Sequence, residues 1–483
     1  MMLQSGELAM IKRPKLSSNN ITNEIINEDL FSKLPDALLT QIQSRLPDAD
    51  AARTRILSNR WNNLFPFLPN LHFSTNLFWP IQQVNKFFNS VNQTLTLRGD
   101  LPIQKLYLHF TDNCEYNRIY DLFRDIVQRR IEELDVNFMI IDLDGRISSR
   151  WNLFRVRSCW DWIKTCNSLV SLSLRWGFVL DIPEALDFPC LKKLNLHCVV
   201  HLNGKSFSNL VSSCPVLEEL VFRRIRRDCD AQLFNIVSPC LKTLIYISTM
   251  SHSDDEVMID APKLEFLQIL DDKSSYYSLK NSPSLVEARI AISSNVLRNV
   301  AHLVTGLSSV KQLTLSPSAV TALGTILVYN RPEYNIHRYN NMHLFPNLVK
   351  LVIRIYSNGD WNNFLALLNH MPNLEHITFA DGFLLFPLTD PYYMSQNPRH
   401  EAPACLRLNV KEVVIRNRKA IQEEEFVVIS YLLKHANNLE VMTINSYQGD
   451  DNLRLKLMNM QLENFARGSH LFRIEFVTCF SLR

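Results

Sequence analysis

The sequence has few of the residues and motifs that catalytic chains usually carry. Only 11 of its 483 residues are glycine, and it contains neither a glycine-rich phosphate loop nor a G-x-S-x-G turn around a nucleophilic serine. It also lacks the H-E-x-x-H pair of zinc proteases. These absences argue against a nucleotide-binding enzyme, a serine hydrolase of that type and a zinc protease, so we expect a protein that is not an enzyme.

Metal-binding patterns are missing as well. The ten cysteines lie far apart inside apolar stretches and form no C-x-x-C pair, whereas structural zinc sites cluster their ligands at short spacing. We expect buried free thiols in a reducing compartment. His197 and His201 lie four residues apart in a strand-then-turn context, which favours a structural role. We therefore expect no metal and no cofactor.

Charge of one sign and long apolar runs are also scarce. The formal net charge is +3 over 483 residues, which gives no indication of nucleic acid or membrane as a partner. No run of about 18 apolar residues predicts a membrane span, and the first residues lack the apolar core of a signal peptide. We expect a soluble, intracellular protein of the nucleus or cytoplasm or both. The basic tetrapeptide at residues 12–15 is either a small nuclear address or a solvated tail.

The stretch from Phe31 to Phe65 has the period of short helices. Leu34-Pro35 marks a helix start, because proline has no N–H to leave unpaired there. Leu38, Leu39, Ile42 and Leu46 then recur every three to four residues until Pro47. Asp50 predicts the cap of a second helix over residues 51–57, and Ser58 predicts the cap of a third. About 40 residues bury too little surface to be stable alone, so such a unit usually docks on another protein.

This stretch resembles the F-box, in its plant form. The resemblance rests on "LPDALL" at residues 34–39, "RLPDADAARTRILSNRW" at 45–61 and the "NLFPFLPNLHF" that follows. It implies docking onto a Skp1-like adaptor and, through it, onto a cullin. The resemblance gives this adaptor-binding role to Leu34, Pro35, Ile42, Leu46, Leu57 and Trp61. Leu38, Leu39 and Leu64 are expected to hold the helices together.

Behind this stretch, apolar residues recur at offsets 0, 3 and 5. From Leu169 the first apolar residues are Leu191, Leu217, Leu241, Leu264, Leu285 and Val310, with steps in the leucine-rich-repeat range of about 20–29 residues. The same pattern occurs twice earlier, from Ile103 and Ile131, and five times later, from Leu348, Leu374, Val410, Leu439 and Leu471. Two longer steps, from Val310 and from Leu374, predict loop insertions.

The residues that precede each repeat support this alignment of the repeats. Proline, cysteine or asparagine stands just before many of the first apolar residues, as in "FPCLKKL" and "MPNLEHI". Each repeat has one apolar face that only a neighbouring repeat can cover, so the repeats stack into a solenoid. We predict an α/β fold with parallel strands on the concave face and short helices, such as residues 206–215, on the convex face. The asparagine with which many leucine-rich repeats bridge their turns is mostly missing, so we expect an irregular solenoid.

The repeat region resembles plant F-box proteins with leucine-rich repeats, and residues 410–444 resemble their C-terminal FBD region. In that region Glu423 to Glu425 begin a predicted helix with Phe426, Ile429 and Leu433 on one face. We predict four parts: a disordered tail (1–28), the F-box (29–75), the solenoid (100–400) and an FBD-like region (401–483) that continues the solenoid.

The resemblance implies a substrate-recognition subunit of an SCF-type (Skp1–cullin–F-box) ubiquitin ligase, whose solenoid holds a protein target of unknown identity. The alternative is an interaction protein with the same parts that does not assemble an active ligase. Gln41 and Gln43 on the first helix are polar residues that we expect to face outward, where a partner would contact them.

Three stretches are candidates for binding a target. Arg223, Arg224, Arg226 and Arg227 form a basic run for an acidic peptide or a polyanion, with a solvated loop as the alternative. Trp160 to Trp162 and the aromatic insertion at residues 383–394 are further surface candidates, because aromatic side chains often anchor interfaces.

Overall fold

The computed structural model divides the chain into two compact units, Met1–Phe65 and Pro66–Arg483. The structure describes residues 31, 33–46, 48–76, 79–111, 114–127, 129–139, 163, 166–175, 186–199, 204–225, 232–249, 255–271, 276–280, 282–292, 303–304, 306–329, 344–355, 358–383, 402–416, 423–446 and 473–478. The predicted tail at residues 1–28 lies outside these ranges.

The first unit is a set of short helices: α1 (Asp36–Ser44), α2 (Asp48–Arg53), the 3-10 turn η1 (Thr54–Ile56) and α3 (Asn59–Leu64). Pro35 precedes α1, as predicted for a proline at a helix start. The Ser58 hydroxyl accepts a hydrogen bond from the N–H of Trp61 at 3.4 Å, so the predicted cap of α3 is confirmed. The second helix begins two residues before Asp50, and its last turn tightens into η1.

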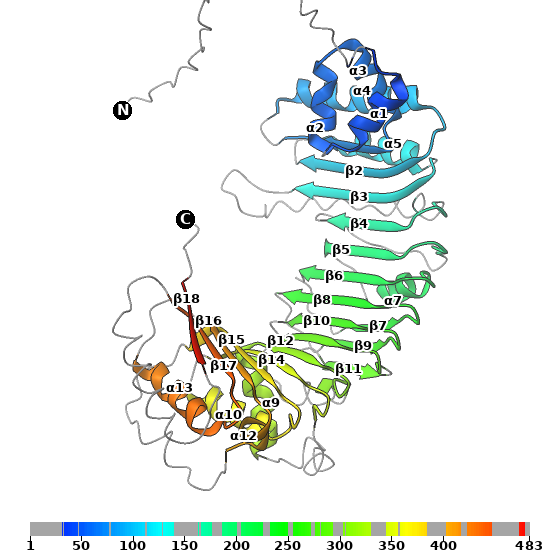
Figure 1. Cartoon of the computed structure of the whole chain (residues 1–483). Coiled ribbons are helices and arrows are strands. Elements are labelled where there is room, and N and C mark those ends of the chain that lie inside the picture. The colour runs from blue at the N-terminus through cyan, green and yellow to red at the C-terminus, as the bar shows by residue number, and fades with distance from the viewer. Residues whose placement is uncertain are drawn as a thin grey trace, which may run out of the picture. The chain divides into compact units, whose positions relative to one another are not determined.

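The second unit is built on one 15-stranded sheet in which all neighbouring strands are parallel (Figure 1). The strands follow one another in chain order, except that three intervening strands form a separate sheet. Its strands are β1 (Asn70–Ser74), β2 (Ile103–Thr111), β3 (Ile131–Met139), β4 (Ser171–Arg175), β5 (Lys193–Val199), β6 (Glu219–Ile225), β8 (Thr243–Thr249), β10 (Phe266–Asp271), β12 (Glu287–Ile292), β13 (Gln312–Leu315), β14 (Lys350–Ile355), β15 (His376–Phe383), β16 (Glu412–Arg416), β17 (Val441–Ser446) and β18 (Arg473–Thr478).

The predicted apolar offsets pair with one another across this sheet. Leu172 is the register partner of Leu194, and Leu194 of Leu220; the same alignment continues to Ile474 on the last strand. All predicted offset residues from Leu169 to Ile444 are buried. The parallel solenoid predicted from the repeats is confirmed, and its core is a set of continuous apolar rows.

A second, three-stranded sheet was not predicted. It consists of β7 (Leu233–Val237), β9 (Glu256–Asp260) and β11 (Tyr276–Lys280), each lying between two successive strands of the main sheet along the chain. Phe234 of β7 contacts Phe222 of the main sheet with ring centroids 5.9 Å apart. In these repeats a strand therefore takes the place of the short helix that covers the core.

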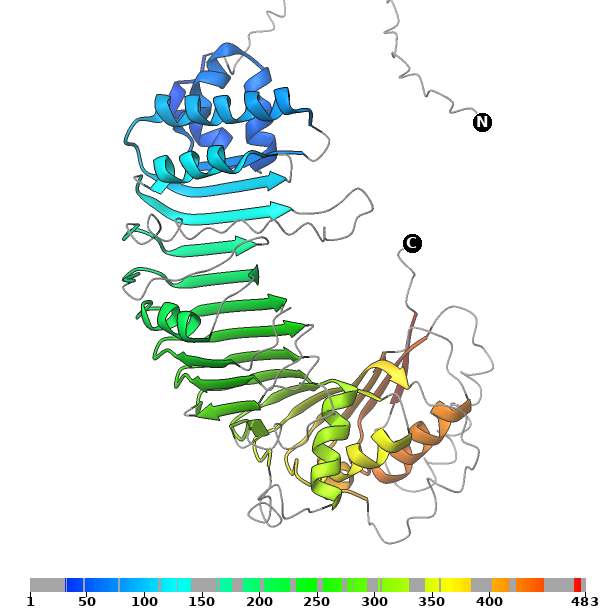
Figure 2. The same ribbon diagram turned by 180° about the vertical axis from the view of Figure 1, so that it is seen from behind.

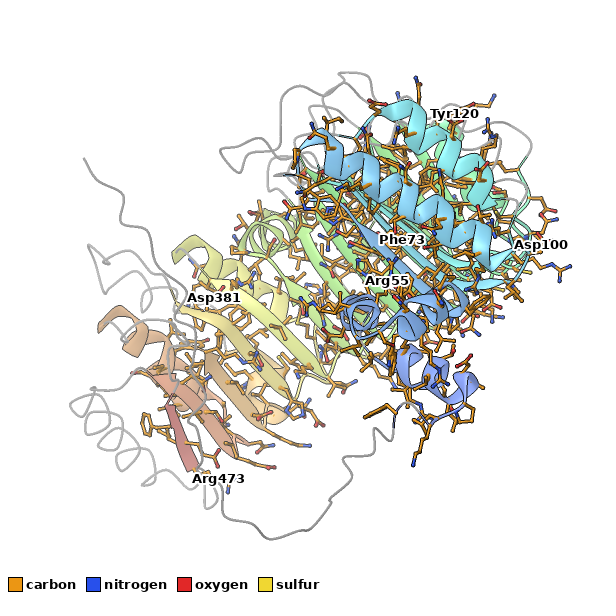
Figure 3. The ribbon with its side chains drawn as sticks, turned by 90° about the horizontal axis from the view of Figure 1, so that it is seen from above. Arg55, Phe73, Asp100, Tyr120, Asp381 and Arg473 are labelled. Carbon is orange, nitrogen blue, oxygen red and sulfur yellow. The ribbon has the colours of Figure 1, made fainter. Side chains whose placement is uncertain are left out.

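Helices cover the same buried side elsewhere. They are α4 (Ile81–Arg98), α5 (Tyr116–Val127), α7 (Gly204–Ser212), α9 (Pro317–Tyr329), α10 (Asn358–Leu368), α12 (Ala404–Leu408) and α13 (Glu423–His435). The predicted convex-side helix at residues 206–215 corresponds to α7. Figure 2 shows α4 and α5 lying along the first strands, and Figure 3 marks Phe73 on β1 beside α4; the rings of Phe73 and Phe87 are 6.4 Å apart.

Two repeats differ from their predicted form. The long step after Val310 was predicted to be a loop insertion. It contains helix α9, which packs on α10. Helix α13 begins at Glu423 as predicted, but its buried residues are Val428, Ile429 and Leu432, while Leu433 is only half-buried. Ile429 is therefore buried as predicted, Leu432 takes the buried place expected of Leu433, and the side chain of Phe426 lies outside the described residues.

Asparagines bridge successive turns in four C-terminal repeats. Each one stands directly before the first apolar residue of its repeat and donates its side-chain N–H to a backbone carbonyl of the preceding repeat. The pairs are Asn347 to Ser308 (3.1 Å), Asn373 to Pro346 (2.7 Å), Asn409 to Pro372 (2.5 Å) and Asn438 to Leu408. Cysteine, valine, cysteine and lysine occupy this position in the repeats that begin at Leu191, Leu217, Leu241 and Leu264.

Candidate interaction surfaces

Gln43 holds the helices of the first unit together. Its side chain is fully buried, and its amide N–H group donates to the Thr54 hydroxyl at 2.6 Å and to the backbone carbonyl of Trp61 at 3.4 Å. Thr54 in turn donates to the carbonyl of Ala51 at 2.7 Å. The expectation that Gln43 faces outward is therefore wrong, whereas Gln41 on the same helix is exposed.

Arg60 joins α3 to the start of α1. Its guanidinium lies 2.7 Å from the Asp36 carboxylate and also donates to the backbone carbonyl of Leu34. Both charged side chains are well exposed, so we assign little stability to the ion pair. Its geometric effect is to fix Leu34 and Pro35 against the helix that carries Trp61.

The first unit exposes several large apolar side chains. Ile56 is 87% exposed, Leu57 64% and Leu38 45%. Two of these were missed from the sequence: Ile56 was not proposed as a binding residue, and Leu38 was expected to pack inside. Leu39 and Leu64 are buried as expected. A large apolar side chain in water is a site where binding a partner removes apolar surface from solvent.

The six residues given an adaptor-binding role lie at or near the surface of this unit. Pro35 and Leu57 are exposed, while the others are half-buried: Leu34, Ile42, Leu46 and Trp61. The hydrogen bonds of Gln43 and Arg60 bring the segments of Leu34, Ile42 and Trp61 together. Phe31 adds an aromatic contact, with its ring centroid 6.4 Å from that of Trp61.

In the sheet unit, the predicted basic run does not lie on one surface. Arg223 is exposed, but the next residue, Arg224, is 5% exposed and binds the buried Asp255 carboxylate at 2.5 Å. Its guanidinium also lies over the Phe234 ring, 4.6 Å from the centroid. Successive residues of a strand point to opposite faces, so Arg224 is held inside and Arg223 outside. Arg226 and Arg227 lie outside the described residues.

The buried side of these strands ends in a polar row. Arg224, Ser248 and Asp271 are register partners on β6, β8 and β10, and all three are buried. Asp255 also accepts a hydrogen bond from the Gln232 N–H at 2.9 Å, and Asp271 accepts one from the Tyr277 hydroxyl at 2.8 Å. Burial raises the pKa of the neighbouring Tyr246 phenol. These contacts link the main sheet to the three-stranded sheet.

The buried thiols of Cys166, Cys214 and Cys405 are poor nucleophiles. Burial raises the pKa of Cys166 and of Cys405 to about 12 and that of Cys214 to about 11. Only the thiolate attacks a substrate or binds a metal strongly. Cys190, by contrast, is exposed.

Several other predicted site residues lie outside the part of the chain that the structure describes. His201, Trp160 to Trp162 and the body of the insertion at residues 384–394 lie outside the described residues, and of Phe383 only the backbone is described. Within the described part of the chain, no group of three or more His, Cys, Asp and Glu side chains is arranged to hold a metal ion. None of the described helices is both long enough and apolar enough to cross a membrane.

Two family models match the chain. Residues 31–72 match the F-box domain, which covers the helical unit and β1. Residues 121–353 match the LRR repeats described for the FBD-associated F-box protein At5g56370, which covers the sheet from α5 to β14. Together these matches span both of the surfaces described above.

Similar proteins occur in Arabidopsis thaliana. The F-box/FBD/LRR-repeat protein At5g22700 is 30% identical over 427 residues, which cover 84% of this chain and 90% of that protein. The F-box/LRR-repeat protein 13 is 27% identical over 89% of this chain and 92% of its own length. The FBD-associated F-box protein At1g66310 is 27% identical over 89% and 91%. The similarity therefore extends over nearly the whole chain.

Proposed function

Because the chain belongs to the plant F-box/FBD/LRR-repeat family, we propose that it is the substrate-recognition subunit of an SCF-type ubiquitin ligase. In this role the F-box binds a Skp1-like adaptor, the adaptor binds a cullin, and the repeat sheet binds a protein target. The chain contributes no chemistry of its own. It accelerates ubiquitin transfer by holding the target close to the charged ubiquitin carrier.

The exposed apolar surface of the F-box carries this proposal. The F-box domain implies Skp1 binding, and this F-box presents Ile56 and Leu57 to solvent beside the half-buried residues of α1 and α3. An apolar helix face of this kind gains stability by packing against the helices of a partner. The buried, hydrogen-bonded Gln43 keeps that surface in one geometry.

Co-purification with the adaptor and the cullin tests the proposal. The wild-type chain should co-purify with both proteins, and the double variant Ile56→Asp/Leu57→Asp should lose both while keeping its circular dichroism spectrum. Leu97→Asp is the matched control, because Leu97 on α4 is also exposed and lies outside the F-box. It should co-purify like the wild type.

Other outcomes separate the two candidate functions. A folded wild-type chain that captures neither protein contradicts the ligase proposal. Capture of the adaptor without the cullin favours an interaction protein that uses the same domains outside an active ligase. We also propose residence in the nucleus or cytoplasm, where such ligases work; localisation of a fluorescent fusion with and without residues 12–15 tests the contribution of the basic tetrapeptide.

A further inference from the structure

A straight row of side chains crosses the open face of the main sheet, opposite the face that packs on α7 and the three-stranded sheet. Register pairing places its members side by side on six neighbouring strands, β4, β5, β6, β8, β10 and β12. We name it the crossing row: Arg175, His197, Arg223, Ile247, Leu270 and Ala291. Each member is half-buried or exposed.

The first half of the crossing row carries a positive charge at Arg223. This residue is exposed, while Arg175 is paired with the Asp135 carboxylate at 2.6 Å. His197 lies between the two arginines, and its pKa is lowered by burial and then by the charges of Arg223 and Arg175. The nearby lysines do not add to this charge, since Lys193 is paired with Glu219 at 3.4 Å. The field at Arg223 therefore attracts an anionic side chain.

The second half of the crossing row is apolar. Ile247 is the register partner of Arg223, and Leu270 and Ala291 continue the row. Val221 and Ile245, which are also register partners, lie beside it on the same face. The open face of a solenoid sheet usually carries polar residues, so this apolar group adjoining an exposed arginine is a surface that a partner can cover.

Unsatisfied polar atoms border the charged half. The side-chain oxygens of Asn137, Ser173 and Asn195 are sheltered and have no hydrogen-bond partner among the described residues. Asn137 is the register partner of Arg175, and Ser173 and Asn195 are register partners of each other. Sheltered polar atoms are normally paired. The three residues are half-buried, so a rotation of their side chains would turn these oxygens toward the backbone N–H groups of a bound chain.

We propose that the crossing row binds one extended segment of a target protein, which crosses Arg175 and His197, places an acidic side chain over Arg223 and places apolar side chains over Ile247, Leu270 and Ala291. Six strands about 4.8 Å apart span about 24 Å, and an extended chain rises about 3.3 Å per residue, so the segment has about seven residues. The inference deepens the proposed function, because it specifies the chemistry of the segment that the ligase recognises.

Selection from a random peptide library tests this inference directly. The full-length wild-type chain is immobilised, and bound peptides of nine residues are sequenced and then measured individually by fluorescence anisotropy. We expect enrichment of peptides in which aspartate or glutamate is followed by leucine, isoleucine or phenylalanine. Because adaptor and cullin are absent from the assay, its result is independent of whether the F-box assembles a ligase.

Charge reversal at two equivalent positions supplies the control. Arg223→Glu should weaken the selected peptides by about tenfold or more, because the attraction for an acidic side chain becomes a repulsion. Arg416→Glu makes the same change at the corresponding position of β16, where Arg416 is exposed on the same face, and should leave binding unchanged. Ile247→Ser should weaken the same peptides.

Four results would overturn the inference. They are a library that yields no binding peptide, selected peptides without acidic residues, equal losses from the Arg223→Glu and Arg416→Glu variants, and binding of phosphorylated peptides alone. The last result would show that the site requires phosphate and not a carboxylate. Circular dichroism of each variant shows that a loss of binding is not a loss of fold.

Discussion

The two compact units handle apolar side chains in opposite ways. In the sheet unit, each repeat has a neighbour that covers its apolar residues, so rows such as Leu172, Leu194 and Leu220 are fully buried. In the F-box unit a glutamine is at the centre, and Ile56 and Leu57 are left in water. Repetition lets a sheet bury its apolar surface within one chain, whereas a unit of about 40 residues has too little interior for that.

This difference indicates where each unit gains its stability. The sheet unit should tolerate loss of a surface group and should be sensitive to any unpaired charge placed between its layers. The F-box unit should depend on a few buried polar contacts, and its exposed apolar residues should matter for binding and not for folding.

The largest expected effect is loss of the buried arginine. In Arg224→Met the buried Asp255 carboxylate loses the guanidinium that lies 2.5 Å from it, which should lower the free energy of unfolding by about 3–5 kcal/mol. Arg223→Met on the same strand is the control, because Arg223 is exposed, and should change it by less than about 0.5 kcal/mol. Urea unfolding followed by tryptophan fluorescence measures both. Equal effects would show that the Arg224–Asp255 pair is not buried as described.

A smaller effect is expected in the F-box unit. Gln43→Met removes the donor to Thr54 and Trp61 from a buried position, and leaving these groups unpaired should cost about 1–3 kcal/mol. Hydrogen exchange across residues 31–65 should rise while exchange in the sheet strands stays the same. Gln41→Met, on the exposed side of α1, should leave exchange unchanged. A rise throughout the sheet would contradict the division into two units.

A still smaller effect concerns the dependence of stability on pH. Burial and the charges of Arg223 and Arg175 lower the pKa of His197 from the ordinary value of 6.5, so the unfolded chain binds this proton before the folded chain does. The free energy of unfolding therefore falls as the pH is lowered through 6.5. Thermal unfolding of His197→Asn should show a flatter fall between about pH 7 and pH 5. An unchanged slope would contradict the lowered pKa.

The smallest effect on stability is expected for an exposed apolar residue of the F-box unit. Leu57→Ser removes an apolar side chain that is already in water, so its effect on the free energy of unfolding should be less than about 0.5 kcal/mol. Chemical denaturation of the isolated chain checks this. A loss above about 2 kcal/mol, typical of a buried leucine, would show that Leu57 packs inside the free protein.

The sequence predicted the sheet well because one local pattern repeats along it. Leu169, Leu172 and Leu174 already show which residues of a strand face inward, and parallel stacking then aligns every repeat. Strands β1, β7, β9 and β11 were missed because none was counted among the repeats, and β7, β9 and β11 each bury only two alternating residues. Among these, the apolar residues of β1, Leu71 and Phe73, were read as part of the F-box.

The surfaces were harder to predict, because exposure depends on contacts between distant residues. Nothing near Gln43 in the sequence shows that Thr54 and Trp61 will enclose it. Arg223 and Arg224 are identical residues in sequence. They lie on opposite faces because side chains alternate along a strand and because Arg224 binds the distant Asp255. Each member of the crossing row stands six residues after the first apolar residue of its repeat, so the repeat pattern aligns the row, but the sequence does not show which of its members are exposed or unpaired.

The asparagine bridges give the sheet unit an uneven stiffness. From Asn347 to Asn438, each turn is tied by a side-chain bond to the turn before it, whereas the strands that carry the apolar half of the crossing row begin behind cysteine, lysine and serine. The C-terminal repeats should therefore resist spreading at their turns. The repeats near residues 190–285 are joined by a longer bond, from the Ser238 hydroxyl to the Leu217 carbonyl at 3.4 Å, and should bend more easily. A target that closes or opens the curve of the sheet therefore does so at the place where we propose that it binds.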